Sequence, residues 1–287
     1  MFHVIDNPTA GKKGHAKNLQ TLERVFKENG VEYMIHTTTH KGGGKEIVEK
    51  LTADGGKDIV VVGGDGTVHE VLNGMKDPTA CRLGIIPSGT GNDFVYSAKI
   101  PMDAEEAAML IVKGETKPTD YIEVGERRCM NICGAGMDVD VLERCERGKG
   151  RGKLKYFKSL LGSLFVFKGC KVLVERDGKT EERSALISAV CNGKVFGGGI
   201  KLCMPAEIDD GKMHVVLVDC IGGKIKLIKA LLQLMKGKIT EYPATTVFTC
   251  ERVKFSFEKE TPFQLDGEIY RDGVFDAKLC TGLQIFR

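Results

Sequence analysis

The sequence predicts an α/β protein of two domains: an N-terminal doubly wound domain with a parallel sheet, and a C-terminal β-rich domain built as an antiparallel sandwich. Three observations predict this fold. Apolar, β-branched runs alternate with helical segments up to about residue 118, glycine-rich loops follow several of these runs, and hairpin patterns dominate afterwards. The 287 residues are enough for each part to bury its own core. We expect the boundary near Pro118, which gives domains 1–118 and 119–287.

In the first half, strands are expected to alternate with helices. The expected strands are residues 2–5, 31–38, 59–62 and 83–86, and the helices lie near 16–28, near 45–51, after the third strand and from about residue 92. Parallel strands bring their carboxyl ends to one edge of the sheet, where such sheets bind ligands. The loops that follow these strands are rich in Gly, Asn, Asp and Thr, so we expect a binding site at that edge.

The segment DIVVVGGDGTVHEVLNG, residues 58–74, shows this arrangement most clearly. An apolar run typical of a strand buried on both faces ends at glycines, and a helix follows. Thr67 and Glu70 have the T-x-x-E spacing of a capping box. Backbone amides and the positive helix end favour an anion there, with phosphate as the first candidate. The glycines match neither a P-loop nor a dinucleotide fingerprint, and an ordinary strand-to-helix turn is the alternative.

In the second half, the dipeptide Asp177-Gly178 between two strand-like runs predicts a hairpin. Further strands are expected in MHVVLVDC, TTVFTCERVKFSFEK and FDAKLCTGLQIFR, and one helix at about 224–236. This pattern is typical of an antiparallel sheet or sandwich with few helices.

Composition indicates where the protein works and excludes some partners. The net charge of +3 is too small to suggest a nucleic-acid partner. The ten cysteines form no C-x-x-C pair, the first residues carry no apolar signal region, and no apolar run reaches the roughly 20 residues of a membrane helix. We therefore expect a cytoplasmic protein with reduced thiols.

Five short motifs follow one another along the chain. They are N-P-x-x-G-K at 7–12, G-G-D-G-T at 63–67, G-T-x-N-D at 89–93, D-D-G at 209–211 and D-G-E at 266–268. In these motifs and their order the chain resembles the soluble bacterial diacylglycerol kinase-like lipid kinases, whose catalytic domain is shared with sphingosine and ceramide kinases. The resemblance implies a first domain of the NAD kinase type, ATP as donor, a lipid hydroxyl as acceptor and an active site between the domains.

The resemblance also assigns nucleotide and phosphoryl-transfer roles. The implied nucleotide contacts are Asn7, Thr38, Gly63, Gly64, Asp65, Gly66, Thr67, Val68, His69 and Thr90. Lys12 and Asp93 would flank the phosphoryl or substrate site, and Asp65 would organise a nucleotide-bound metal or water. The family commonly has Asn where this chain has His69. A neutral imidazole can still donate one hydrogen bond, so the loop can work with this change.

Two acidic motifs of the second half complete the implied site. The resemblance implies a Mg²⁺ held by the Asp210 carboxylate and the main-chain carbonyls of Glu207 and Lys212, and a general base at Glu268. Mg²⁺ prefers a few hard oxygens and retains water, and an alcohol needs an acceptor for its proton. By their residues alone, 209–211 also suit a hairpin turn and Glu268 suits a solvated carboxylate.

A basic and apolar segment suggests a membrane surface. Residues 144–158 contain seven basic residues and one acid, and an aromatic and aliphatic run at 156–167 follows. The segment is too short to span a bilayer but suits one lying on it, and a basic loop before a packed helix is the alternative. We expect peripheral association with the inner face of the membrane, where the lipid substrate lies. An exposed sheet edge could also support a homodimer.

The sequence therefore predicts an enzyme, a cytoplasmic lipid kinase that uses ATP and Mg²⁺ to phosphorylate a lipid hydroxyl such as that of diacylglycerol. An NAD kinase is the first alternative, because it shares the G-G-D-G junction. A catalytically silent nucleotide- or lipid-binding module is the second, with His69 as its only hint. The motifs do not name the lipid.

Overall fold

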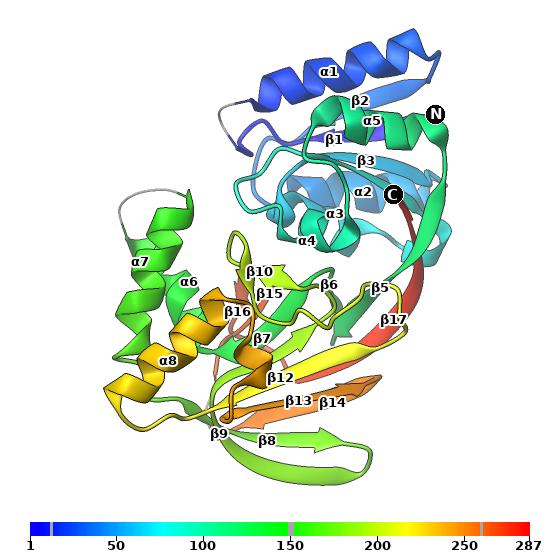
Figure 1. Cartoon of the computed structure of the whole chain (residues 1–287). Coiled ribbons are helices and arrows are strands. Elements are labelled where there is room, and N and C mark those ends of the chain that lie inside the picture. Colours follow the sequence, from blue (N-terminus) through cyan, green and yellow to red (C-terminus); the bar gives the residue numbers. More distant parts are fainter. Residues whose placement is uncertain (12–13, 149–151, 259–260) are drawn as a thin grey trace. The chain divides into compact units, whose positions relative to one another are not determined.

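The computed structural model describes residues 1–11, 14–148, 152–258 and 261–287 (Figure 1). The chain divides into two compact units, one formed by Met1–Asp120 with Thr281–Arg287 and the other by Tyr121–Cys280. The chain therefore crosses between the units twice, within β5 (Thr116–Val124) and within β17 (Phe275–Phe286).

The first unit is a parallel sheet covered by helices on both faces, as predicted. Its sheet has the order β4-β3-β1-β2, and α1 and α5 pack together on one face while α2 and α3 pack together on the other (Figure 1). Residues 59–62 of the third strand are fully buried, as a strand covered on both faces requires. The elements are β1 (Phe2–Asp6), α1 (His15–Glu28), β2 (Tyr33–Thr37), α2 (Gly43–Ala53), β3 (Asp58–Gly63), α3 (Asp65–Gly74), η1 (Pro78–Ala80), β4 (Arg82–Pro87), α4 (Asp93–Ala98) and α5 (Ala104–Lys113).

The predicted capping box between Thr67 and Glu70 is wrong. The helix α3 begins earlier, at Asp65, and has no side-chain cap at its N-terminus. The Glu70 carboxylate instead accepts hydrogen bonds from the backbone amides of Gly42 and Gly44, at 2.8 and 3.0 Å. These amides lie at the start of α2, which packs against α3. Glu70 therefore caps the neighbouring helix α2, whereas its spacing from Thr67 predicted that it would cap α3.

The end of the chain also differs from the expected domain limits, which placed everything after residue 118 in the second domain. Residues 281–287 belong to the first unit. There Gln284 and Ile285 pair in parallel with Arg82 and Leu83 of β4, and the Phe286 ring is buried. This return is possible because β17, with 12 residues, is long enough to contribute to both units.

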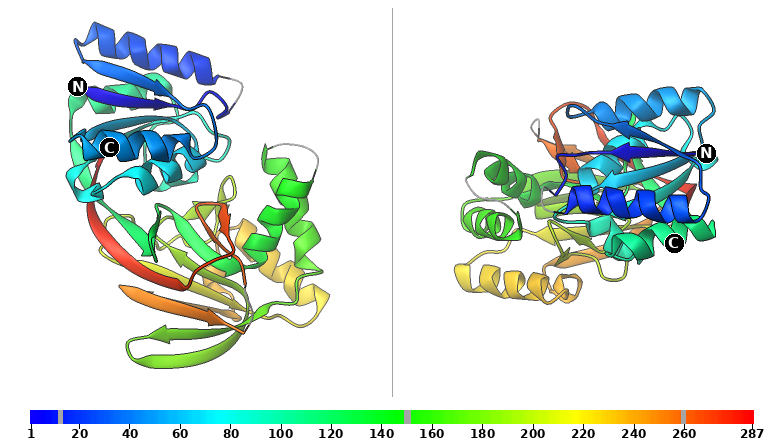
Figure 2. Two further views of the ribbon diagram at one scale, coloured as in Figure 1. Left: turned by 180° about the vertical axis from the view of Figure 1, so that it is seen from behind. Right: turned by 90° about the horizontal axis from the view of Figure 1, so that it is seen from above.

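The second unit is an antiparallel β sandwich with helices (Figure 2). The strand β9 joins its parts, since its first half pairs with β8 and its second half lies between β7 and β12. The elements are β6 (Arg127–Cys129), β7 (Ile132–Gly136), α6 (Met137–Arg147), α7 (Gly152–Leu164), β8 (Cys170–Arg176), β9 (Lys179–Cys191), β10 (Val195–Phe196), β11 (Ile200–Lys201), β12 (Met213–Asp219), α8 (Lys224–Met235), η2 (Ile239–Glu241), β13 (Thr245–Cys250), β14 (Arg252–Phe257), β15 (Phe263–Leu265) and β16 (Glu268–Tyr270).

Two hydrophobic cores hold the second unit. One lies between strands and contains Phe255, Phe263 and Phe275, and the other lies beneath α6, α7 and α8 and contains Leu164 and Leu234. The predicted hairpin at Asp177-Gly178 is confirmed, with positive φ at both turn residues. The expectation of one helix is wrong, because α6 and α7 accompany α8 in the described part of this unit.

Candidate functional site

Three loops gather at the carboxyl edge of the first unit's sheet. They are residues 7–11 after β1, residues 63–67 around the start of α3, and residues 88–92 after β4. The Asn7 side-chain amide donates to the Thr67 hydroxyl at 2.9 Å, and the Ser88 backbone amide donates to the Gly63 carbonyl at 2.8 Å. A Cβ on Gly11, where φ is positive, would collide with the Ser88 carbonyl. The predicted meeting of these loops at one sheet edge therefore occurs.

Two of the loops touch through glycines. A Cβ added to Gly64 would lie 2.7 Å from the Gly89 Cα, and one added to Gly89 would lie 2.5 Å from the Gly64 Cα. Real Cβ atoms do not approach this closely, so neither position has room for a side chain. The result is a patch of bare backbone beside the N-terminus of α3, where amide groups and the helix dipole favour an anion.

Asp65 has a structural role in this patch. One of its carboxylate oxygens accepts hydrogen bonds from the backbone amides of Asp93 and Phe94, at 2.8 and 3.3 Å. It therefore provides the acceptor that the backbone amides in the first turn of α4 lack within their own helix. The residue before this helix, Asn92, has a left-handed backbone conformation and provides no side-chain cap. The role of Asp65 toward a nucleotide-bound metal or water stays a prediction.

The other predicted nucleotide residues differ in exposure. Thr90 is exposed, Gly66 is half-buried, and the side chains of Thr38, Val68 and His69 are buried. The His69 side chain is 3% exposed and lies 3.4 Å from the Asn73 amide nitrogen, on the same helix. Lys12 lies outside the described residues. A direct nucleotide contact is thus easiest to reconcile with Thr90 and the glycine backbone.

A buried polar pair behind the first loop was missed by the sequence analysis. The carboxylate of Asp6, the last residue of β1, lies 2.6 Å from the His15 imidazole at the start of α1. Its second oxygen accepts from the Thr37 hydroxyl at 3.1 Å. Both Asp6 and His15 are over nine-tenths buried, so the pair fixes the two ends of the loop that carries Asn7. The sequence feature that could have indicated this pair is Asp6, an acid at the end of an apolar strand.

In the second unit, Glu268 begins β16 directly after a tight turn. Asp266 and Gly267 both have positive φ, as tight turns between antiparallel strands require. The Asp266 carboxylate accepts hydrogen bonds from the backbone amides of Met130 and Asn131, each at 2.8 Å. It thereby ties the turn to the start of β7. Glu268 itself is half-buried, and its role as a general base stays a prediction.

A second set of side chains supports the same turn. The Gln264 side-chain oxygen accepts from the Gly267 amide at 2.9 Å, and its nitrogen donates to Asp138 at 3.1 Å. Burial raises the pKa of Asp138 to about 6. Burial, followed by the charge of Glu268, also raises the pKa of Tyr270 to about 12. Gly267, the residue before Glu268, is therefore held by the buried side chain of Gln264, which is itself bonded to Asp138. No local sequence pattern indicated this role of Gln264 and Asp138.

The predicted metal residues lie on the turn before β12. Asp210 is exposed, accepts from the Lys212 backbone amide at 3.1 Å and lies 3.5 Å from the His214 imidazole. A hydrogen bond with Cys203 raises the pKa of His214. The Glu207 side chain pairs with Lys194 at 2.5 Å, which leaves its main-chain carbonyl as the predicted ligand. Over the described residues there is no group of three or more acidic, His or Cys side chains suited to a metal. One carboxylate with carbonyls and waters suits Mg²⁺ better than zinc.

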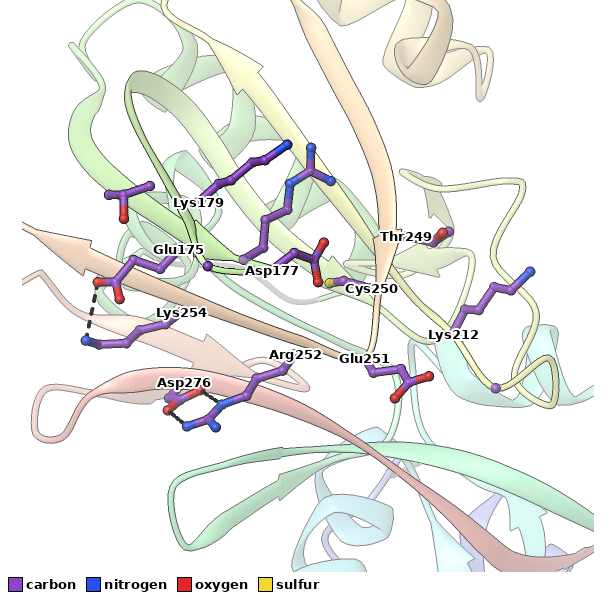
Figure 3. Close-up of a pocket in the computed structure, with 14 residues that line it drawn as sticks. Glu175, Asp177, Lys179, Lys212, Thr249, Cys250, Glu251, Arg252, Lys254 and Asp276 are labelled. Carbon is purple, nitrogen blue, oxygen red and sulfur yellow. Dashed lines mark hydrogen bonds and ion pairs between the residues drawn. The ribbon is translucent and has the colours of Figure 1, made fainter.

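A broad polar depression of about 1060 Å³ lies at the β8–β9 hairpin of the second unit (Figure 3). Of the predicted site residues, Lys212 is on its wall. The Arg252 guanidinium pairs with Asp276 at 2.7 Å, and the Lys254 ammonium pairs with Glu175 at 3.3 Å, so these charges are satisfied within the wall. The described residues that line the depression do not direct a set of catalytic or ligand-binding side chains toward one point, so we assign it no ligand.

Comparison with known proteins identifies both units. The diacylglycerol kinase catalytic domain matches residues 1–124, and the YegS C-terminal NAD kinase beta sandwich-like domain matches residues 131–279. A diacylglycerol kinase of Bacillus subtilis (strain 168) is 27% identical over 274 residues, which cover 92% of this chain and 88% of that protein. A "Probable lipid kinase YegS-like" of Yersinia enterocolitica is 28% identical over 275 residues, which cover 90% and 88%.

Solved structures agree on the fold. Two crystal structures from Bacillus anthracis str. Sterne superpose with TM-scores of 0.80 and 0.76 at 24% and 23% identity, each over 99% of this chain and 96% of the other. The two family matches together span both units and the loops described above. The chain therefore belongs to the diacylglycerol kinase and YegS-like family of lipid kinases.

Proposed function

We propose that this protein transfers the γ-phosphoryl group of ATP to the hydroxyl of a membrane lipid such as diacylglycerol. The observation that carries the proposal is the contact of the two glycine loops at Gly64 and Gly89. It leaves unobstructed backbone at the N-terminus of a ten-residue helix, where a phosphate chain can approach closely. Asn7, Thr67 and Thr90 supply amide and hydroxyl groups around it.

Glu268 acts as the general base. A lipid alcohol is almost never ionised at neutral pH, so its proton must pass to an acceptor as its oxygen attacks phosphorus. The proton moves to the Glu268 carboxylate, a bond forms between the hydroxyl oxygen and the γ-phosphorus, and the bond to the β-phosphate oxygen breaks to release ADP. The anchored turn at Asp266 and Gly267 supports this role because it fixes the residue that precedes the base.

In this proposal the Asp210 carboxylate would hold a Mg²⁺ together with the main-chain carbonyls of Glu207 and Lys212. The chemistry that the ion would supply is positive charge to offset the negative charge of phosphate groups. The donors fit, because all three are oxygens and Asp210 is exposed to water that can complete an octahedron. We propose roles for Lys12 and Asp93 at the phosphoryl or substrate site, as the motifs imply.

The protein acts at a membrane surface in this proposal, on the cytoplasmic side, without spanning it. In the described ranges, no helix has the length and apolar character needed to cross a bilayer. The segment singled out in the sequence is partly packed and partly exposed: Leu160 and Leu164 are buried, whereas Leu154, Phe165 and Val166 are exposed. These exposed side chains support peripheral association. Residues 149–151 of this segment lie outside the described residues.

A panel of acceptors tests the function. Labelled ATP and Mg²⁺ are offered with diacylglycerol, phosphatidylglycerol, a sphingoid base or a polyprenol in mixed vesicles, and separately with NAD, and products are identified by mass spectrometry. We expect one class of lipid phosphate to form and NAD to remain unchanged. NADP formation would establish the NAD kinase alternative, and ATP binding without any product would establish the silent module.

Glu268→Gln tests the base. The amide keeps the shape of the side chain but cannot take up a proton, so we expect kcat on the lipid acceptor to fall by about 10²–10⁴-fold. The affinity for ATP, measured by calorimetry, should be unchanged. Glu126→Gln, the same substitution at an exposed turn of the same unit, is the matched control and should be fully active. Turnover within about twofold of wild type would contradict the assignment.

Gly64→Ala tests the glycine contact. The new Cβ would lie 2.7 Å from the Gly89 Cα, so the two loops must separate. We expect the Kd for ATP to rise at least about tenfold, equivalent to about 1.4 kcal/mol, with little change in the circular dichroism spectrum. Gly222→Ala, at a glycine with open space around it, is the control. If both variants bound ATP like wild type, the loops would be only structural.

Asp210→Ala tests the metal. Loss of the one carboxylate ligand should raise the Mg²⁺ concentration needed for half-maximal activity by about tenfold or more, while calorimetry still detects ATP. Asp209→Ala, a neighbouring exposed carboxylate, serves as the comparison. An unchanged Mg²⁺ dependence in the Asp210 variant would exclude this site.

A further inference from the structure

The helix α8 has two apolar faces, of which the second unit covers one. Figures 1 and 2 both show it beside α6 and α7. Its covered face packs on the core beneath these helices through Leu227, Ala230, Leu231 and Leu234. Its other apolar face is exposed: Ile225 is 73%, Ile228 44%, Leu232 53% and Met235 47% exposed. The packing of the unit therefore covers one apolar face of this helix and leaves the other exposed.

The exposed side chains form one continuous strip. Their spacing of three, four and three residues places them on one side of a helix. At about 100° per residue they span an arc of about 80°, centred about 130° away from the covered face. The strip therefore faces away from the core that holds the helix.

Lysines border the strip on both sides. Lys224 lies next to one edge and Lys229 and Lys236 next to the other, and Lys226 and Lys238 are close by in the sequence. No Asp or Glu occurs between residues 220 and 240. Among the residues that the structure describes, no acidic partner lies within ion-pair distance of these five lysines, and all five are exposed.

This arrangement fits an anionic lipid surface better than a second copy of the chain. An apolar strip can enter the boundary of headgroups and acyl chains, while long lysine side chains extend to lipid phosphates on both sides. A two-fold contact between identical strips would bring the same lysine rows together, so like charges would oppose the pairing. The partner must therefore be apolar in the middle and negatively charged around it.

We propose that α8 is an interfacial helix that lies flat in the headgroup region of an anionic bilayer. The inference rests on the proposed lipid-kinase function and deepens it, because it names the surface through which the second unit meets the membrane. This surface differs from residues 144–167, which the sequence indicated. The exposed Phe165 and Val166, which follow α7, belong to the same unit but are not required.

A single tryptophan tests insertion directly, since the chain contains none. Leu232→Trp places the reporter in the middle of the strip, and Leu173→Trp places it on β8 at a side chain that is 42% exposed. With vesicles of phosphatidylglycerol and phosphatidylcholine, we expect a blue shift and quenching by brominated lipids for the first variant and neither for the second. If the Leu232→Trp variant sediments with the vesicles but its tryptophan emission does not change, the proposal is overturned.

A charge reversal tests the lysine borders. Lys224→Glu, Lys229→Glu and Lys236→Glu together should lower partition into anionic vesicles at least about tenfold. Lys50→Glu, Lys76→Glu and Lys113→Glu, exposed lysines of the first unit, give a control with the same net charge and should retain binding. If both triple variants lost vesicle binding equally, only the net charge would matter, and the proposal that α8 binds the membrane would be rejected.

Two readouts separate this proposal from the proposed function. The α8 triple variant should still phosphorylate a short-chain, water-soluble diacylglycerol at the wild-type rate, because no predicted catalytic residue is changed. If wild type phosphorylates no lipid but its Leu232→Trp variant still inserts, the membrane surface stands and the kinase proposal fails. A blue shift that depends on protein concentration without vesicles would identify a second copy as the occupant and overturn the lipid assignment.

Discussion

The loops of the first unit can meet only because Gly64 and Gly89 have no side chains. Their backbones approach so closely that a single added carbon at either position would lie 2.5–2.7 Å from the other Cα. Other contacts of the site depend on this approach. Asp65 reaches the first turn of α4, and Ser88 bonds to the carbonyl of Gly63. The glycines in these motifs are therefore required by the packing of loop on loop, and the bare backbone that suits phosphate follows from that packing.

The aspartates of the G-G-D-G-T and D-G-E motifs both accept hydrogen bonds from backbone amides. Asp65 satisfies the first turn of α4 in the first unit, and Asp266 satisfies the amides of Met130 and Asn131 in the second. A carboxylate that accepts two amides holds a loop more firmly than a neutral group can, because such hydrogen bonds are charge-assisted. At these positions a sequence motif alone cannot separate a catalytic requirement from a structural one. Glu268, by contrast, follows an anchored turn in which other residues provide the anchoring.

Sequence patterns predicted what local forces decide. The buried run of β3, the hairpin at Asp177-Gly178 and the three loops of the candidate site could be recognised from alternation, turn residues and motifs. The amide partners of Glu70 could not, because they lie 26–28 residues away on a helix whose packing is a tertiary choice. The Asp6–His15 pair behind the first loop was missed because such pairs lack periodicity, and an isolated acid is usually a surface residue. Because the pair is buried, removing either side chain would leave the other without a hydrogen-bond partner and without water to replace it, which would destabilise the loop.

The surface that we propose for membrane binding shows most clearly how the fold adds to the sequence. Counting charges favoured residues 144–158, where basic residues are densest. At about 100° per residue, the apolar residues of KIKLIKALLQLM in α8 span an arc of about 220°, which is wider than a helix needs to face one core. Only the packing against Leu164 and its neighbours shows that the core takes one side of this helix. The remaining strip, bordered by lysines on both sides, is the basis of our proposal that α8 binds an anionic lipid surface, since such a surface combines an apolar interior with negative charge.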